Sequence, residues 1–205
     1  MGIQSLDDMS AQYYDVLKEI GNIGAGNAMT ALSQMINCKV DMKVPQVRLL
    51  EFKDVATLVG GEEHLLAGIF LEVEGDISGS IMFLIELSAA KHLIEKLMGM
   101  PVGEGDTLGE MEESAMKEVS NIITGAYLNS LSSMTNLKIF PSVPYLAVDM
   151  AGAILSVPAI QFGFVGDKIL LIQSQFSDDI EIDGFFILMP DLESYDKILH
   201  SLGIM

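Results

Sequence analysis

The chain has 205 residues, of which 50% are hydrophobic and 20% charged, so it can bury a sizeable core and is not an intrinsically disordered chain. Its 29 Asp and Glu residues against 11 Lys and Arg give a net charge of -18, the wrong sign for binding nucleic acid. A membrane-spanning helix needs about 20 consecutive apolar residues, and no apolar run in the sequence approaches that length. The first ten residues lack a secretion signal, and the single Cys38 excludes an intrachain disulfide. We therefore expect a cytoplasmic protein without a membrane partner.

The sequence repeats itself at an offset of 99 residues. Twelve of the 31 positions in residues 15–45 are identical to their counterparts in 114–144, where unrelated segments would share about two. The identical pairs include Glu19 and Glu118, Asn22 and Asn121, and Gly26 and Gly125. We interpret the chain as a single domain, residues 1–205, made of two repeats at about 1–100 and 106–205.

The first half begins with a helical pattern over residues 6–35, whose glycine-rich middle is a place where the helix can break. Segments rich in Val, Ile, Leu and Phe follow, and they predict strands at 40–52, 67–73 and 77–86. A short amphipathic helix at 88–98 ends the half.

The second half follows a joint at residues 101–106 and repeats this order of elements. We predict a capping box over residues 107–110, then a helix to about residue 133. The later elements are strands at 137–150, 153–164, 168–176 and 180–189 and a helix at 192–202. Because strand follows strand, the sequence predicts an α+β fold with an antiparallel sheet, helices segregated to one side and pseudo-two-fold symmetry.

The repeat retains polar residues that share one helical face. At about 100° per residue, positions i, i+4, i+7 and i+11 form a single stripe. The two stripes are Asp15, Glu19, Asn22 and Gly26, and Ser114, Glu118, Asn121 and Gly125. We expect both stripes to face outward, while the apolar positions Val16, Ile20, Ile23, Ala31, Met111, Ala115, Val119 and Ile122 face away from them. Each glycine would let a partner approach its helix closely.

A single exposed Glu on a helix usually serves only solubility. Two Glu-x-x-Asn pairs at equivalent places in diverged halves instead indicate a function, because Asn is a mediocre helix former and surface positions drift. The three histidines, His64, His92 and His200, do not recur at the repeat offset, so a catalytic Ser-His-Asp or Cys-His site is unsupported.

A metal site in this chain is equally poorly supported. One cysteine and scattered histidines exclude structural zinc. Asp15 and Glu19 could bind Mg²⁺ through their carboxylates, but the second half has Ser114 in place of Asp15, and the one remaining carboxylate is too few ligands for this ion. A carboxamide, however, can orient a water molecule while staying uncharged at every pH, as Gln does in GTP hydrolysis. The Glu and Asn pairs therefore suit hydrolysis of a phosphoryl group that is already activated on a partner.

At these residues the sequence resembles the CheC/CheX/FliY family of phosphatases, which act on the phosphorylated chemotaxis response regulator CheY. The resemblance is carried by a pattern that occurs twice. In it, Asp or Ser is followed after three intervening residues by Glu, after two more by Asn, and after 22 more by Pro. Its residues are Asp15, Glu19, Asn22 and Pro45, then Ser114, Glu118, Asn121 and Pro144. The size of the chain is most similar to the CheC branch.

The resemblance implies a role for each residue of the pattern. Asn22 and Asn121 would hold the attacking water in line with the aspartyl phosphate, and Glu19 and Glu118 would pair with the catalytic lysine of CheY. Asp15 and Ser114 would support these pairs at the rim. Mg²⁺ would be supplied by the response regulator, and this chain would bind no cofactor.

Two other functions stay open at this point. Relatives of the fold serve as flagellar switch components, which bind other rotor subunits without catalysis, although such proteins usually lose the Glu and Asn pairs. The family also implies docking to the receptor deamidase CheD, which is compatible with phosphatase activity.

Overall fold

The computed structural model describes residues 11–43, 46–162, 168–177 and 181–203. Within these ranges lie six helices and eight strands. In chain order they are α1 (Ala11–Met35), β1 (Asp41–Met42), β2 (Gln46–Glu51), α2 (Phe52–Leu58), β3 (Leu65–Gly75), β4 (Gly79–Glu86), α3 (Leu87–Met98), α4 (Glu110–Thr135), β5 (Ile139–Pro141), β6 (Tyr145–Met150), α5 (Ala151–Phe162), β7 (Lys168–Ser177), β8 (Glu181–Pro190) and α6 (Leu192–Ser201).

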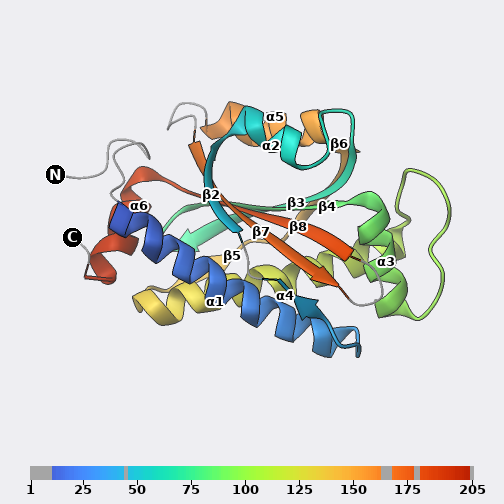
Figure 1. Cartoon of the computed structure of the whole chain (residues 1–205), viewed down its shortest axis with the longest axis horizontal. Helices are drawn as coiled ribbons and strands as arrows, with labels where there is room; N and C mark the ends of the chain where they lie inside the picture. The colour runs from blue at the N-terminus through green and yellow to red at the C-terminus, as the bar shows by residue number, and fades with distance from the viewer. Residues whose placement is uncertain (1–10, 44–45, 163–167, 178–180, 204–205) are drawn as a thin grey trace.

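All eight strands form one antiparallel sheet at the centre of the molecule (Figure 1). The order is β1-β7-β8-β4-β3-β5, with β2 also pairing β7 and β6 also pairing β3. The two halves of the chain meet where β8 pairs β4. Each half supplies the outer strands that cover the other half, since β1 and β2 lie on β7 while β5 and β6 lie on β3. The predicted antiparallel sheet is confirmed, and neither half could form this sheet alone.

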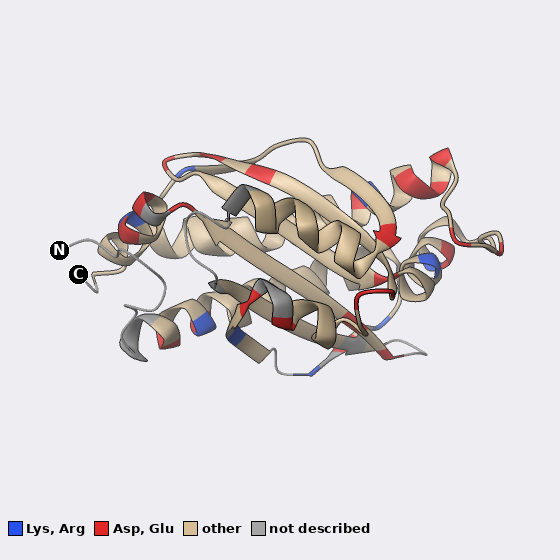
Figure 2. Ribbon diagram, turned by 90° about the horizontal axis from the view of Figure 1, so that it is seen from above, with Lys and Arg blue, Asp and Glu red and all other residues tan. Residues whose placement is uncertain are grey.

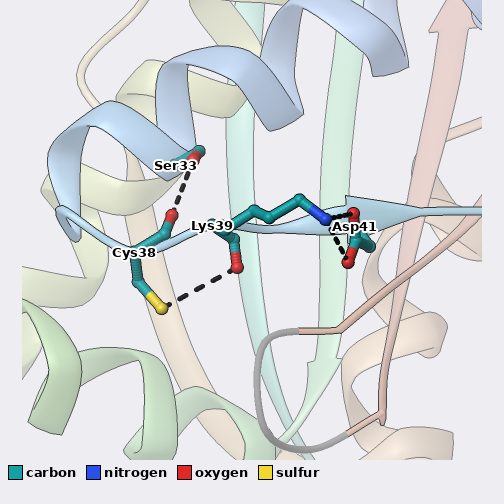
Figure 3. Close-up of polar contacts among 4 residues, drawn as sticks. All are labelled: Ser33, Cys38, Lys39 and Asp41. Atoms are coloured by element: carbon teal, nitrogen blue, oxygen red, sulfur yellow. Dashed lines mark hydrogen bonds and ion pairs between the residues drawn. The ribbon is translucent and has the colours of Figure 1, made fainter.

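The offset of 99 residues is visible in local geometry as well as in sequence. Asn37 and Asn136 both have positive φ, 49° and 58°, a conformation that Asn tolerates better than most residues. The Ser33 hydroxyl donates to the Cys38 carbonyl at 2.6 Å (Figure 3). The equivalent Ser132 hydroxyl donates to the Leu137 carbonyl at 2.6 Å. The repeat therefore retains these residues to turn the chain from a long helix into the first short strand.

Four helices, α1, α3, α4 and α6, cover one face of the sheet over the larger part of the core. These are the four helices that the sequence predicts, and they do lie on one side. Two further short helices, α2 and α5, cover part of the opposite face above a second apolar cluster (Figure 1). The one-sided arrangement predicted from the sequence is therefore incomplete.

Helix α5 replaces a predicted strand, because residues 153–164 read as β but residues Ala151–Phe162 are helical. A short apolar run without alternation does not distinguish a buried strand from a helix. Tertiary contacts decide here: the amides of Ala151 and Gly152 donate to the carbonyls of His64 and Glu62 at 2.8 and 2.9 Å. These bonds satisfy two amides of the first turn that have no partner within the helix. Its equivalent α2 (Phe52–Leu58) begins at the last residue of the predicted strand 40–52 and continues beyond it.

The long helices α4 and α1 differ from the sequence prediction in where α4 begins and in the continuity of α1. The predicted capping box at 107–110 is displaced, since α4 begins at Glu110 behind Gly109, and the Gly109 amide donates to the Glu112 carboxylate. Helix α1 continues through its glycines without a break, and its predicted residues 6–10 lie outside the described part of the chain.

Helix α6 is fastened to the β3–β4 turn through its N-cap. The Asp191 carboxylate accepts the Ser194 amide at 2.7 Å and also the hydroxyl of Ser78. Burial alone would raise the pKa of the Asp191 carboxyl, but the hydrogen bonds from Ser78 and Ser194 and the charge of Lys197 outweigh it, so the pKa lies below its ordinary value.

None of the helices within the described ranges combines the length and apolar character needed to cross a membrane.

Candidate functional site

The two long helices α1 and α4 lie side by side beneath the sheet and run in opposite directions (Figure 1). They approach closely where Gly24 faces the ring of Tyr127, because a Cβ added to Gly24 would stand 2.4 Å from the Cδ1 atom of that ring. Nearby, the Asn27 side chain donates to the Ser130 hydroxyl at 2.9 Å. This packing fixes the direction in which each helix presents its outer face.

Tyr127 is a structural anchor under this crossing. Its ring stacks on Phe186 with centroids 3.9 Å apart, and its hydroxyl shares a hydrogen bond of 3.1 Å with Ser174. Burial raises the pKa of Tyr127 to about 12, an effect that the hydrogen bond to Ser174 partly offsets. Burial also raises the pKa of Tyr195 on α6. Both phenols therefore stay neutral and belong to the core.

The first polar stripe lies on α1. Asp15 and Glu19 are exposed, whereas Asn22 is half-buried. The Oδ1 atom of Asn22 is buried and has no hydrogen-bond partner among the residues that the structure describes. Pro45, the last residue of the first pattern, lies outside the described ranges.

The second polar stripe lies on α4 and is more open. Ser114, Glu118 and Asn121 are all exposed, and Pro144 is half-buried. The Ser114 hydroxyl donates to the carbonyl of Glu110 in its own helix at 2.9 Å. The Ser114 hydroxyl is therefore already hydrogen-bonded to its own helix backbone. Of the two carboxamides, that of Asn121 is more accessible to a partner than that of Asn22.

The glycines that end the stripes have no evident role inside the protein. A Cβ on Gly26 or Gly125 would meet no described atom within 4 Å. Gly21 contrasts with them, because a Cβ there would stand 3.0 Å from Val47 and 3.1 Å from Ile172. A glycine inside a helix costs about 1 kcal/mol relative to Ala, so Gly26 and Gly125 are retained against helix stability and leave room at the surface.

Two residues assigned to the buried side of these helices are exposed. Ile23 is 37% exposed and Met111 is 67% exposed, so the apolar stripes predicted from the sequence are wrong at these positions. Helix α1 buries Leu17, Ile20, Ala25, Ala28 and Leu32, and the predicted apolar position Ile20 is therefore confirmed. The exposure of Met111 could have been predicted from helical spacing, because Met111 lies seven residues before Glu118 and thus on the same face of the helix.

A second polar place in the molecule lies where the α2–β3 loop meets the start of α3. Two adjoining pockets there share His64, Glu86 and Ser88. The Ser88 hydroxyl donates to a Glu86 oxygen at 2.7 Å, and His64 Nε2 lies 3.7 Å from the other oxygen. The serine thus contacts the carboxylate and not the imidazole, so these residues do not form a nucleophile and base pair. Across the described ranges, no three His, Cys, Asp or Glu side chains are grouped so that they could hold a metal ion.

Comparison with known proteins gives relatives over nearly the whole chain. The family model described as the CheC-like family matches residues 14–48 and 111–146, the segments that carry the two stripes. The CheY-P phosphatase CheC of Bacillus subtilis is 37% identical over 194 residues, which cover 92% of this chain and 93% of that protein.

Two further similarities concern proteins named FliY. The flagellar motor switch phosphatase FliY of Bacillus subtilis is 33% identical over 69% of this chain but only 37% of its own length. The crystal structure of FliY from Thermotoga maritima has a TM-score of 0.75 at 20% identity and covers 96% of this chain and 98% of that one. This likeness shows a shared fold.

Proposed function

The chain belongs to the CheC-like family, and we propose on that basis that it is a phosphatase that hydrolyses the aspartyl phosphate of the response regulator CheY. One observation carries the proposal beyond family membership. Glu and Asn recur one turn apart on both α1 and α4, each pair followed by a glycine with open space above it, and only Asn22 among the four side chains is half-buried. The proposal includes the cytoplasmic location predicted from the sequence.

In the proposed mechanism the two residues of each pair divide the work. Asn22 and Asn121 orient the attacking water, because a carboxamide both donates and accepts hydrogen bonds without changing charge. Glu19 and Glu118 dock on the catalytic lysine of CheY and fix the register. Asp15 and Ser114 support them at the rim. The Mg²⁺ that neutralises the phosphoryl charge belongs to the regulator, and this chain's own residues supply only positioning.

The energy required is compatible with so small a set of groups. An acyl phosphate hydrolyses spontaneously, and a hundredfold acceleration needs only about 2.7 kcal/mol of transition-state stabilisation. Holding one water molecule in line can supply an effect of this size. No strongly shifted catalytic pKa and no covalent intermediate on this chain are needed.

The direct experiment mixes the protein with phosphorylated CheY and Mg²⁺ and follows inorganic phosphate over time. We expect faster release than from phosphorylated CheY alone. Binding of CheY without any acceleration would contradict the phosphatase proposal and favour the alternative of a non-catalytic, flagellar-switch-like binding module.

The family resemblance also implies a second partner, the receptor deamidase CheD, and a different surface offers a place for it to dock. On the α5 side of the sheet, Tyr145, Val157 and Ile160 are exposed, the last by 74%. Tyr145 and Val157 line an apolar pocket whose floor includes Phe70 and Met82. Exposed apolar groups around a pocket are typical of protein interaction sites, and this one lies on the other face of the sheet from the stripes.

We propose that CheD docks on this α5 surface. Val157→Lys combined with Ile160→Lys should abolish CheD binding, measured by calorimetry, and leave phosphate release from CheY unchanged. Unaltered CheD affinity in this variant would exclude the α5 surface as the docking site.

A further inference from the structure

Met111 is an exposed apolar residue that the fold does not explain. It is 67% exposed in the first turn of α4. Spacings of three, four, three and four residues connect it in turn with Ser114, Glu118, Asn121 and Gly125. Such spacing places all five on one face of the helix. Met111 therefore stands at one end of the second stripe and Gly125 at the other.

Met111 and Gly125 mark the two ends of the second stripe, and the distance between them follows from helix geometry. Fourteen residues at 1.5 Å each separate Met111 from Gly125 by about 21 Å along the helix. Gly125 has no described neighbour within 4 Å of its Cβ position, so the helix backbone is open there. Methionine is among the residues enriched in the buried centres of protein interfaces, and it adapts to irregular partner surfaces.

The charge around Met111 restricts the partner. Five acidic residues lie between positions 104 and 113, and no Lys or Arg occurs from 97 to 116. Figure 2 shows acidic residues gathered where α3, the following loop and the start of α4 meet. One of these carboxylates, Glu113, pairs with Lys117 at 3.6 Å. The others leave the region negative, so it suits a partner surface that carries basic groups around an apolar centre.

We propose that Met111 and Gly125 set the docking register of the receiver domain of phosphorylated CheY on the second site. Met111 is the apolar anchor, and Gly125 admits the main chain of the partner, so that Glu118 and Asn121 between them meet the phosphorylated centre. This assignment rests on the proposed phosphatase function. The first half has Gln12 at the position of Met111, so the first site lacks this anchor.

The test uses Asn22→Ala as background, so that phosphate release reports the second site alone. Met111→Gln, which installs the side chain of the first half, and Gly125→Ala should each raise KM for phosphorylated CheY by about fivefold to tenfold with kcat unchanged. The melting temperature should be unchanged for Met111→Gln and unchanged or higher for Gly125→Ala. Controls are Met150→Gln on β6 and Gly103→Ala in the α3–α4 loop, which replace an exposed methionine and an unobstructed glycine outside the stripe.

Unchanged KM in both variants, or an equal rise in the controls, would overturn the docking assignment while the phosphatase function stands. If the wild-type protein itself released no phosphate, the function would fail separately. Affinity for CheY activated with beryllium fluoride then decides the docking claim, since Met111→Gln and Gly125→Ala must still weaken binding about fivefold or more. Equal affinity of all variants in that measurement would reject it.

Discussion

Two alanine substitutions two residues apart on α1 should change stability in opposite directions. In Gly24→Ala the new Cβ would stand 2.4 Å from the Tyr127 ring, whereas ordinary contacts begin near 3.4 Å, so the helix or the ring must move by the difference. The ring cannot yield easily, because it stacks on Phe186 and its hydroxyl is bonded to Ser174. Overpacking of this kind costs about 1–3 kcal/mol, and the better helix propensity of Ala offsets up to about 1 kcal/mol.

Gly26→Ala meets no such obstacle. Its Cβ would enter open space, so only the propensity effect applies, and we expect a gain of about 0.5–1 kcal/mol in the free energy of unfolding. Urea denaturation measures both variants against the wild type, with the midpoint shift interpreted at constant slope. A Gly24→Ala protein more stable than the wild type, or a destabilised Gly26→Ala protein, would refute the packing argument. The stabilised Gly26→Ala protein should nevertheless show a higher KM for phosphorylated CheY at its first site, because the added Cβ occupies the open space above the helix.

Three further outcomes follow from particular contacts. Asn121→Ala should remove a larger share of phosphate release than Asn22→Ala, because Asn121 is exposed while the Oδ1 atom of Asn22 is buried. Each single variant should keep part of the activity. The reverse ranking in phosphate-release assays would contradict this reasoning. Tyr127→Phe should lower the free energy of unfolding by about 1–2 kcal/mol, since the buried Ser174 hydroxyl loses its partner, and urea midpoints test this. Asp191→Ala should cost about 1 kcal/mol at pH 7 through the lost helix cap. The folded state lowers the pKa of Asp191 below its ordinary 3.8, so this difference should persist above that value and vanish as the pH falls through the folded pKa, and an undiminished difference at pH 2 would argue against it.

The elements that sequence reasoning found are those whose signals are local. The repeat offset, the long helices and the strand-after-strand order lie in periodicity and composition, and the antiparallel sheet follows from them. The outward position of Glu19, Glu118 and Asn121 follows from helical spacing alone. Which strands of one half pair with the other half is a tertiary property that no local pattern encodes.

The errors have tertiary causes as well. Helix α5 is specified by two amides that find carbonyls in the α2–β3 loop, more than 80 residues earlier in the chain. Helical spacing defines a face but not its width, so it does not determine the exposure of Ile23. Met111 differs, because its spacing of seven residues from Glu118 already indicates the exposed face. The difference in burial between Asn22 and Asn121 arises from their surroundings, although the pattern around them is the same.

Phosphate release by the double variant Asn22→Ala with Asn121→Ala tests the water-orienting role most directly. With phosphorylated CheY and Mg²⁺ present, the double variant should release phosphate no faster than CheY alone, while its circular dichroism and melting temperature match the wild type. Release at the wild-type rate from a folded double variant would contradict the role assigned to both carboxamides.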